Sequence, residues 1–210
     1  MTGFWTPERR HSLYLGILLF ILSAIVQITL GHYSSMRSLS APYARDVFLD
    51  NLPVVDLTPV IVAGNILLWI FGFFLLIKNP RYLSFGIKAI ALLDICRAFF
   101  ISLTHLGPYP HAFSPGPDNF GYGIYKIFTF QGNYFFSGHT ALPFMFALIF
   151  WDNDLLRRFF VFLTAFFGAA VLFAHVHYSI DVFAAPFIVY GVYAITTKVF
   201  AHDYALAESG

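Results

Sequence analysis

The chain of 210 residues has little charge and almost no cysteine. Only 11% of its residues are charged, whereas a soluble domain carries about a quarter. Its net charge is +1, with no basic tract, which argues against a nucleic-acid partner. The one cysteine, Cys96, cannot form a disulfide within the chain, so the redox compartment stays open. No internal repeat or domain boundary is visible, and we expect a single membrane-embedded domain over residues 1–210.

Apolar residues, by contrast, are abundant and form long blocks. They make up 59% of the chain, and the mean hydropathy is +0.72. A helix that crosses a bilayer needs about 20 of them in a row. The sequence therefore predicts an all-α integral membrane protein with six transmembrane helices, at residues 12–30, 59–77, 84–103, 135–151, 159–174 and 180–200.

Two of these predicted helices are unusual. The first follows Arg9 and Arg10 like a signal peptide, but it is long for one and lacks a clear cleavage site, so we expect it to be retained. The third carries Lys88, Asp94 and Arg97 within its apolar residues. Ionisable groups at membrane depth need a partner and often mark a functional site.

The distribution of cations predicts that both termini lie inside, because cytoplasmic loops are rich in Lys and Arg. The outer ends of the third to sixth helices then lie on one side of the membrane. The inner segments would hold Arg9, Arg10, Lys78, Arg81, Arg157, Arg158 and Lys198, against Arg37, Arg45 and Lys126 outside.

Histidines and other polar residues gather at these outer ends, in FFSGHTALPF (135–144) and FAHVHYSIDVF (173–183). His177 and Asp181 are four residues apart and share a helix face. The carboxylate can accept the Nδ1 proton of the imidazole and leave Nε2 as a nucleophile or base. His139 supplies a second imidazole, which could protonate a leaving group and later deprotonate an acceptor.

Donors for an anion accompany the histidines. Ser137, the Gly138 amide and the start of the fourth helix favour negative charge, although Ser137 is also suited to cap that helix. Arg97 adds a planar cation that matches phosphate oxygens. The constellation predicts a substrate that is a phosphate ester with a lipid at its other end.

These motifs carry a resemblance. SGHT (137–140), followed by HVHYSID (175–181) and YAITTKVF (193–200), resembles the sphingomyelin synthase family, a branch of the type 2 phosphatidic acid phosphatase, or lipid phosphate phosphatase, superfamily. RAFFISLTHLGP (97–108) is similar to the family's arginine- and threonine-bearing stretch, and DNLPVVD (50–56) more loosely to its loop motif.

The resemblance implies a lipid phosphate phosphatase-like bundle. Its active site would face the exoplasmic, periplasmic or luminal side of a bacterial inner membrane, or of a Golgi, plasma or endoplasmic reticulum membrane. The family's reaction, without metal or cofactor, moves phosphocholine or phosphoethanolamine from a phospholipid donor to ceramide or another lipid alcohol and releases diacylglycerol. Whether the chain forms a homo-oligomer stays open.

The resemblance also assigns roles to residues. His177 would form a phosphohistidine, Asp181 would orient it, and His139 would be the general acid and base. The expected substrate- and phosphate-binding residues are Arg97, Ser137, Gly138, His175, Val176 and Tyr178.

The chain departs from the family at two places that bear on the head group. Val176 stands where the family has an acidic residue, and QGN (131–133) stands where it has Cys-Gly-Asp. A missing carboxylate removes the obvious partner of an ammonium. Cation selection could fall to Tyr134 and Tyr178 or be absent, so head group and acceptor stay open.

Other functions use the same residues. Water could replace the acceptor, which would give a phospholipase C-type hydrolase or a lipid phosphatase. AVLFA (170–174) lacks the arginine of the superfamily's phosphatases, which favours a phosphodiester substrate. A zinc site or transporter and a non-catalytic lipid-binding protein are the remaining alternatives. His175 suits loop structure and substrate contact equally, and any contribution of Asp94, His105 or His111 stays open.

Overall fold

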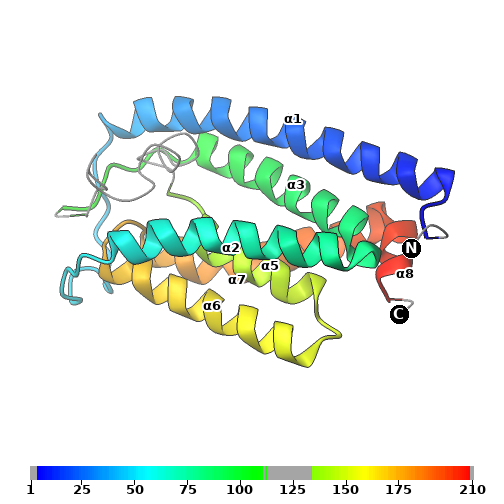
Figure 1. Cartoon of the computed structure of the whole chain (residues 1–210). Coiled ribbons are helices and arrows are strands. Elements are labelled where there is room, and N and C mark those ends of the chain that lie inside the picture. Colours follow the sequence, from blue (N-terminus) through cyan, green and yellow to red (C-terminus); the bar gives the residue numbers. More distant parts are fainter. Residues whose placement is uncertain (1–3, 111, 113–133, 209–210) are drawn as a thin grey trace.

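The computed structural model describes residues 4–110, 112 and 134–208, and these are helices joined by turns, with no strand among them (Figure 1). An all-helical bundle is thus confirmed, and each predicted segment overlaps one helix. The helices are α1 (Pro7–Ser38), α2 (Thr58–Lys78), α3 (Pro80–Leu103), α5 (Gly138–Ile149), α6 (Asp154–Phe173), α7 (Ser179–Val199) and α8 (Ala201–Glu208). The sequence did not predict α8.

Among the described residues, four helices are long and apolar enough to cross a membrane: α1, α2, α6 and α7. The other two predicted spans differ from them in charge or length. Helix α3 has 24 residues but carries charges at Arg81, Lys88, Asp94 and Arg97. Helix α5 has 12 residues, about 18 Å at 1.5 Å per residue. An integral membrane protein is supported, while six spans with both termini inside stay a prediction.

Helix α5 forms the centre of the bundle. All of its residues except Gly138 and Phe144 are buried, and it packs against α6 and α7 with α2 also beside it. A Cβ atom at Gly72 of α2 would overlap the ring of Phe146, so the glycine lets the two helices approach closely. Helix α1, by contrast, turns large apolar side chains outward, as expected of a surface that faces lipid.

Different segments of the chain form the two ends of the bundle (Figure 1). The end of α3 and the starts of α5 and α7 lie at one end, together with the loop between α1 and α2. Both termini and α8 lie at the other end. The arrangement places the segments that carry the histidine motifs at the same end of the molecule.

A buried ion pair joins three helices at the end with the termini. Lys88 Nζ of α3 lies 2.6 Å from Asp203 Oδ2 of α8 and donates to Ser12 Oγ of α1 at 2.5 Å. The Ser12 hydroxyl also lies 2.6 Å from the other Asp203 oxygen and 3.0 Å from Ser84 Oγ. The side chains of Lys88 and Asp203 are only 2% and 6% exposed. One charge of α3 is therefore neutralised inside the protein.

Candidate active site

His177 and Asp181 form a buried pair at the start of α7. His177 lies in the turn before the helix, and its Nδ1 is 3.2 Å from Asp181 Oδ2. The Tyr178 backbone N–H donates to the same carboxylate oxygen at 3.0 Å. The other oxygen, Oδ1, is buried with no hydrogen-bond partner among the described residues. The carboxylate is thus held so that it can fix the imidazole tautomer, with Nδ1 carrying the proton.

His139, in the first turn of α5, faces this pair. The ring centroids of His139 and His177 are 5.8 Å apart. Both ring nitrogens of His139 are buried and have no hydrogen-bond partner in the described part of the chain. Because buried polar atoms are nearly always bonded, such an exception points to a functional group. One imidazole comes from α5 and the other from the turn before α7, and the two adjoin one site.

Arg97 reaches the same place from α3. Its Nε donates to the Phe136 carbonyl at 3.1 Å. A Cβ atom at Gly138 would lie 3.2 Å from Arg97 Nε and 3.5 Å from Cζ. The missing side chain at Gly138 therefore gives the guanidinium room beside the first turn of α5.

Ser137 connects α5 to α7. It is the N-cap of α5, and its Oγ accepts from the Thr140 backbone N–H at 3.4 Å. Its own backbone N–H donates to the Asp181 carbonyl at 3.0 Å. The capping role is confirmed, and because that backbone N–H is already bonded, a phosphate contact of Ser137 would have to use the hydroxyl.

The structure places three other expected binding residues in contact with aromatic rings or loops: His175, Val176 and Tyr178. His175 has a φ of 54°, in the left-handed region, and its ring lies 5.4 Å from that of Tyr109. Val176 is half-buried beside the same aromatic cluster. The Tyr178 hydroxyl donates to the Gly107 carbonyl at 2.8 Å and accepts from the Ala44 N–H at 3.2 Å, so it ties two loops together. Tyr134 is the tyrosine beside His177, with ring centroids 6.4 Å apart.

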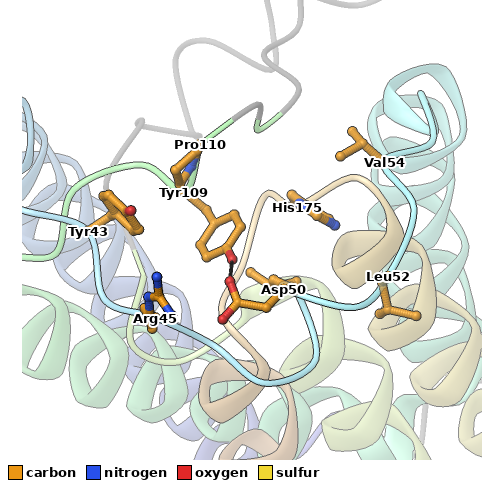
Figure 2. A pocket seen from close by; sticks show the side chains of 9 residues that line it. Tyr43, Arg45, Asp50, Leu52, Val54, Tyr109, Pro110 and His175 are labelled. Carbon is orange, nitrogen blue, oxygen red and sulfur yellow. Dashed lines mark hydrogen bonds between the residues drawn. The ribbon is translucent and has the colours of Figure 1, made fainter.

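A cavity of about 350 Å³ opens next to the turn between α6 and α7 that carries His175 and His177 (Figure 2). His175 lines it, but His139 and His177 do not. Sequence reasoning missed this cavity, although DNLPVVD includes part of its wall. The lining residues are Tyr43, Arg45, Leu49, Asp50, Leu52, Val54, Tyr109, Pro110 and His175.

Asp46 fastens this loop to the start of α7, and sequence reasoning also missed it. Its Oδ2 accepts from the Ser179 N–H at 2.7 Å, and Oδ1 accepts from the N–H groups of Phe48 and Leu49. Burial acts to raise the pKa of Asp46, but these hydrogen bonds outweigh it and lower the pKa below its usual value. A charged Asp46 thus supports both the loop and the helix that holds Asp181.

The His177 imidazole is held in its neutral form. Burial is the main cause, and the charge of Arg97 acts in the same direction, while a hydrogen bond with the Tyr134 backbone opposes them. Together they lower the pKa of His177 to about 3. A neutral imidazole is the form that can act as a nucleophile or base.

The remaining expectations concern a bound metal ion and residues away from the histidine pair. Within residues 4–110, 112 and 134–208, no group of three or more His, Cys, Asp or Glu side chains could hold a metal ion; a metal-free reaction nevertheless stays a prediction. His105 Nε2 is buried and lacks a partner in the described ranges. His111, Lys126 and the QGN segment (131–133) lie outside the described residues.

A comparison with known protein families matched the part of the chain that carries the two histidine motifs. Residues 132–198 match the family model described as PAP2 superfamily C-terminal. The match covers both histidine motifs and Asp181, and it supports the type 2 phosphatidic acid phosphatase superfamily, whose chemistry is that of lipid phosphatases and phosphotransferases. It does not single out the sphingomyelin synthase branch. No curated protein matches the chain.

Proposed function

We propose that the protein is a lipid head-group phosphotransferase that works through a phosphohistidine. The observation that carries the proposal is the buried His177–Asp181 pair, 3.2 Å apart, with the His139 ring 5.8 Å from that of His177. Two imidazoles, of which a carboxylate orients only one, suit a reaction with two successive displacements. The donor is a membrane phospholipid, and the acceptor is ceramide or another lipid alcohol.

In the first displacement, Nε2 of His177 attacks the phosphorus of the phosphodiester. A P–N bond forms, the P–O bond to diacylglycerol breaks, and His139 gives a proton to the departing oxygen. In the second displacement, His139 takes the proton from the acceptor hydroxyl, whose oxygen attacks phosphorus. The P–N bond then breaks, which restores neutral His177 and protonated His139.

The charge near the histidines supports a phosphodiester donor. A diester carries one negative charge, and Arg97 supplies a guanidinium beside His139 and His177. Gly138 leaves room for that guanidinium. A phosphomonoester dianion favours more positive charge. Under the predicted orientation the site lies on the exoplasmic, periplasmic or luminal side.

The test uses purified full-length protein in detergent with fluorescent phosphatidylcholine and phosphatidylethanolamine, with and without ceramide. Every lipid product is resolved. We expect the wild-type protein to make a ceramide-linked phospholipid and the His177→Ala variant to make none. His202→Ala is the matched control, because His202 is an exposed histidine on α8 at the opposite end of the bundle.

Two results would contradict the transferase. Diacylglycerol that forms at the same rate with or without ceramide, and with no new phospholipid, indicates that water is the acceptor, as in a phospholipase C-type hydrolase. Full turnover by His177→Ala would remove the phosphohistidine from the mechanism.

A further inference from the structure

The loop between α1 and α2 binds the short segment that separates His177 from Asp181. Asp46 of this loop accepts, through Oδ2, a hydrogen bond from the Ser179 N–H at 2.7 Å. Ser179 is the first residue of α7, and it lies 133 residues from Asp46 along the chain. A side chain of a distant loop therefore caps the helix that carries Asp181.

Tyr178 makes a second contact with the same loop. Its hydroxyl accepts from the Ala44 N–H at 3.2 Å, and its backbone N–H donates to Asp181 Oδ2 at 3.0 Å. The same carboxylate oxygen lies 3.2 Å from His177 Nδ1. The loop, the backbone of the turn and the imidazole thus form one series of contacts. A displacement of the loop would move the carboxylate relative to the ring.

Asp46 is itself fixed within the loop. Its Oδ1 accepts from the N–H groups of Phe48 and Leu49 at 2.9 and 3.2 Å, and its backbone carbonyl accepts from the Asp50 N–H at 2.8 Å. The residue is 7% exposed. Both carboxylate oxygens are bonded to the backbone of the protein, so Asp46 is suited to act through the turn rather than on a substrate.

The charge of Asp46 matters as well as its shape. The start of a helix is the positive end of its dipole and favours negative groups. Asp181 supplies one carboxylate there from the first turn of α7, and Asp46 supplies the other. An asparagine at 46 has only one acceptor oxygen. It could bond either the loop N–H groups or the Ser179 N–H, but not both as the carboxylate does.

From these contacts we infer that Asp46 is a positioning residue for the His177–Asp181 pair. It caps α7 from the loop between α1 and α2, and so fixes the turn in which His177 Nδ1 meets Asp181 Oδ2. The inference rests on the proposed function, because it adds a residue to the same site.

Two variants break the contact from opposite sides. Asp46→Asn removes it from the loop. Ser179→Pro removes the N–H, and it suits a helix start because proline is favoured at the first helical position. Tyr178 already has the extended conformation that precedes proline, with φ −71° and ψ 155°. Ser179→Pro also tests the inference if Asp46→Asn does not fold. Ser179→Ala keeps the N–H and should have the smaller effect.

The first measurement is the tautomer of His177, which needs no substrate. Nitrogen NMR is recorded on full-length protein in detergent with isotope-labelled histidine, and His177→Ala identifies the signal. We expect the wild type to hold one tautomer, with Nδ1 protonated. Asp46→Asn and Ser179→Pro should each give a mixture of tautomers.

The second measurement is turnover of the fluorescent phospholipids. In both variants kcat should fall about 10- to 100-fold, the effect of misplaced reacting groups. KM should change less than about 3-fold, because the lost contact does not hold the lipid. Since the two substitutions remove the same contact, the double variant should be within about 2-fold of the worse single variant.

Asn153→Ala is the matched control. Asn153 caps α6 by accepting from the Leu156 N–H at 3.0 Å, at the end of the bundle away from the histidines (Figure 1). Its loss removes a helix cap but should change neither the tautomer nor kcat. The inference would be overturned by an unchanged tautomer in both Asp46→Asn and Ser179→Pro. A fall in kcat no greater than that of Asn153→Ala, or a raised KM with unchanged kcat, would also overturn it.

The two proposals fail separately, because the tautomer is measured without turnover. A tautomer that shifts in Asp46→Asn, in a protein that transfers no head group, contradicts only the proposed function. Transfer that depends on His177 but is unaffected by Asp46→Asn and Ser179→Pro contradicts only the positioning role.

Discussion

Removal of either member of the Lys88–Asp203 ion pair should strongly destabilise the protein. The pair joins α3 to α8 at 2.6 Å, and its side chains are 2% and 6% exposed. Loss of one partner leaves the other as an uncompensated buried charge, which costs about 3–5 kcal/mol. We therefore expect Lys88→Met and Asp203→Asn each to lower the free energy of unfolding by roughly this amount.

The double variant Lys88→Met/Asp203→Leu distinguishes charge from packing. It removes both charges and keeps apolar volume, and such replacements are often neutral or stabilising. Ser12 keeps its contact with Ser84, 3.0 Å away. The double variant should therefore be at least about 2 kcal/mol more stable than either single variant.

An ion pair on the protein surface is the matched control. Arg157 and Asp154 are also 2.6 Å apart, but their side chains are 28% and 68% exposed. An exposed pair contributes about 0–1 kcal/mol, so Asp154→Asn should change little. Unfolding is followed by tryptophan fluorescence in mixed micelles titrated with sodium dodecyl sulfate. If the buried single variants cost no more than the control, or if the double variant costs their sum, the reasoning is wrong.

The site yields three further predictions. Asp181→Asn should lower kcat roughly 10³- to 10⁴-fold with little change in lipid affinity, because it disturbs the His177 tautomer rather than the binding surface; lost affinity would instead indicate a structural role. Gly138→Ala places a Cβ 3.2 Å from Arg97 Nε and should lower kcat/KM about 10-fold, whereas an unchanged kcat/KM would remove Arg97 from phosphate binding. The pKa of Asp46 is lowered from 3.8, so its stabilisation is present at neutral pH and disappears as the pH falls through the lowered value. Asp46→Asn should cost about 1–3 kcal/mol at pH 7 and nearly nothing in strong acid; a cost that stays constant with pH would contradict this.

The sequence was most informative where function depends on local spacing. His177 and Asp181 are four residues apart and do pair. They do not share a helix face as expected, because His177 lies in the turn before α7. SGHT sits at a helix start, and Ser137 indeed caps α5. Apolar length predicted the helices, but charge and length left α3 and α5 outside the four candidate spans.

The parts that the sequence did not reveal depend on contacts between distant segments. Asp46 meets Ser179 across 133 residues, and Tyr178 meets Gly107 across 71. Hydrophobic periodicity could not identify Asp46 or Gly107 as the partners, because both residues lie in loops. Lys88 was recognised only as an unusual charge, since Asp203 lies on a short helix that has no apolar signal of its own.

The Lys88–Asp203 pair also sets an order of events during synthesis. The two residues are 115 positions apart, and a chain grows at about 5–20 residues per second. Roughly 6 to 23 s therefore pass before the ribosome adds the anion that Lys88 needs. Helices α1 and α3 can meet during this interval, but their shared polar contact with α8 cannot close. A chain interrupted before α8 keeps an ammonium group without its counter-ion, which distinguishes it from a chain that includes α8.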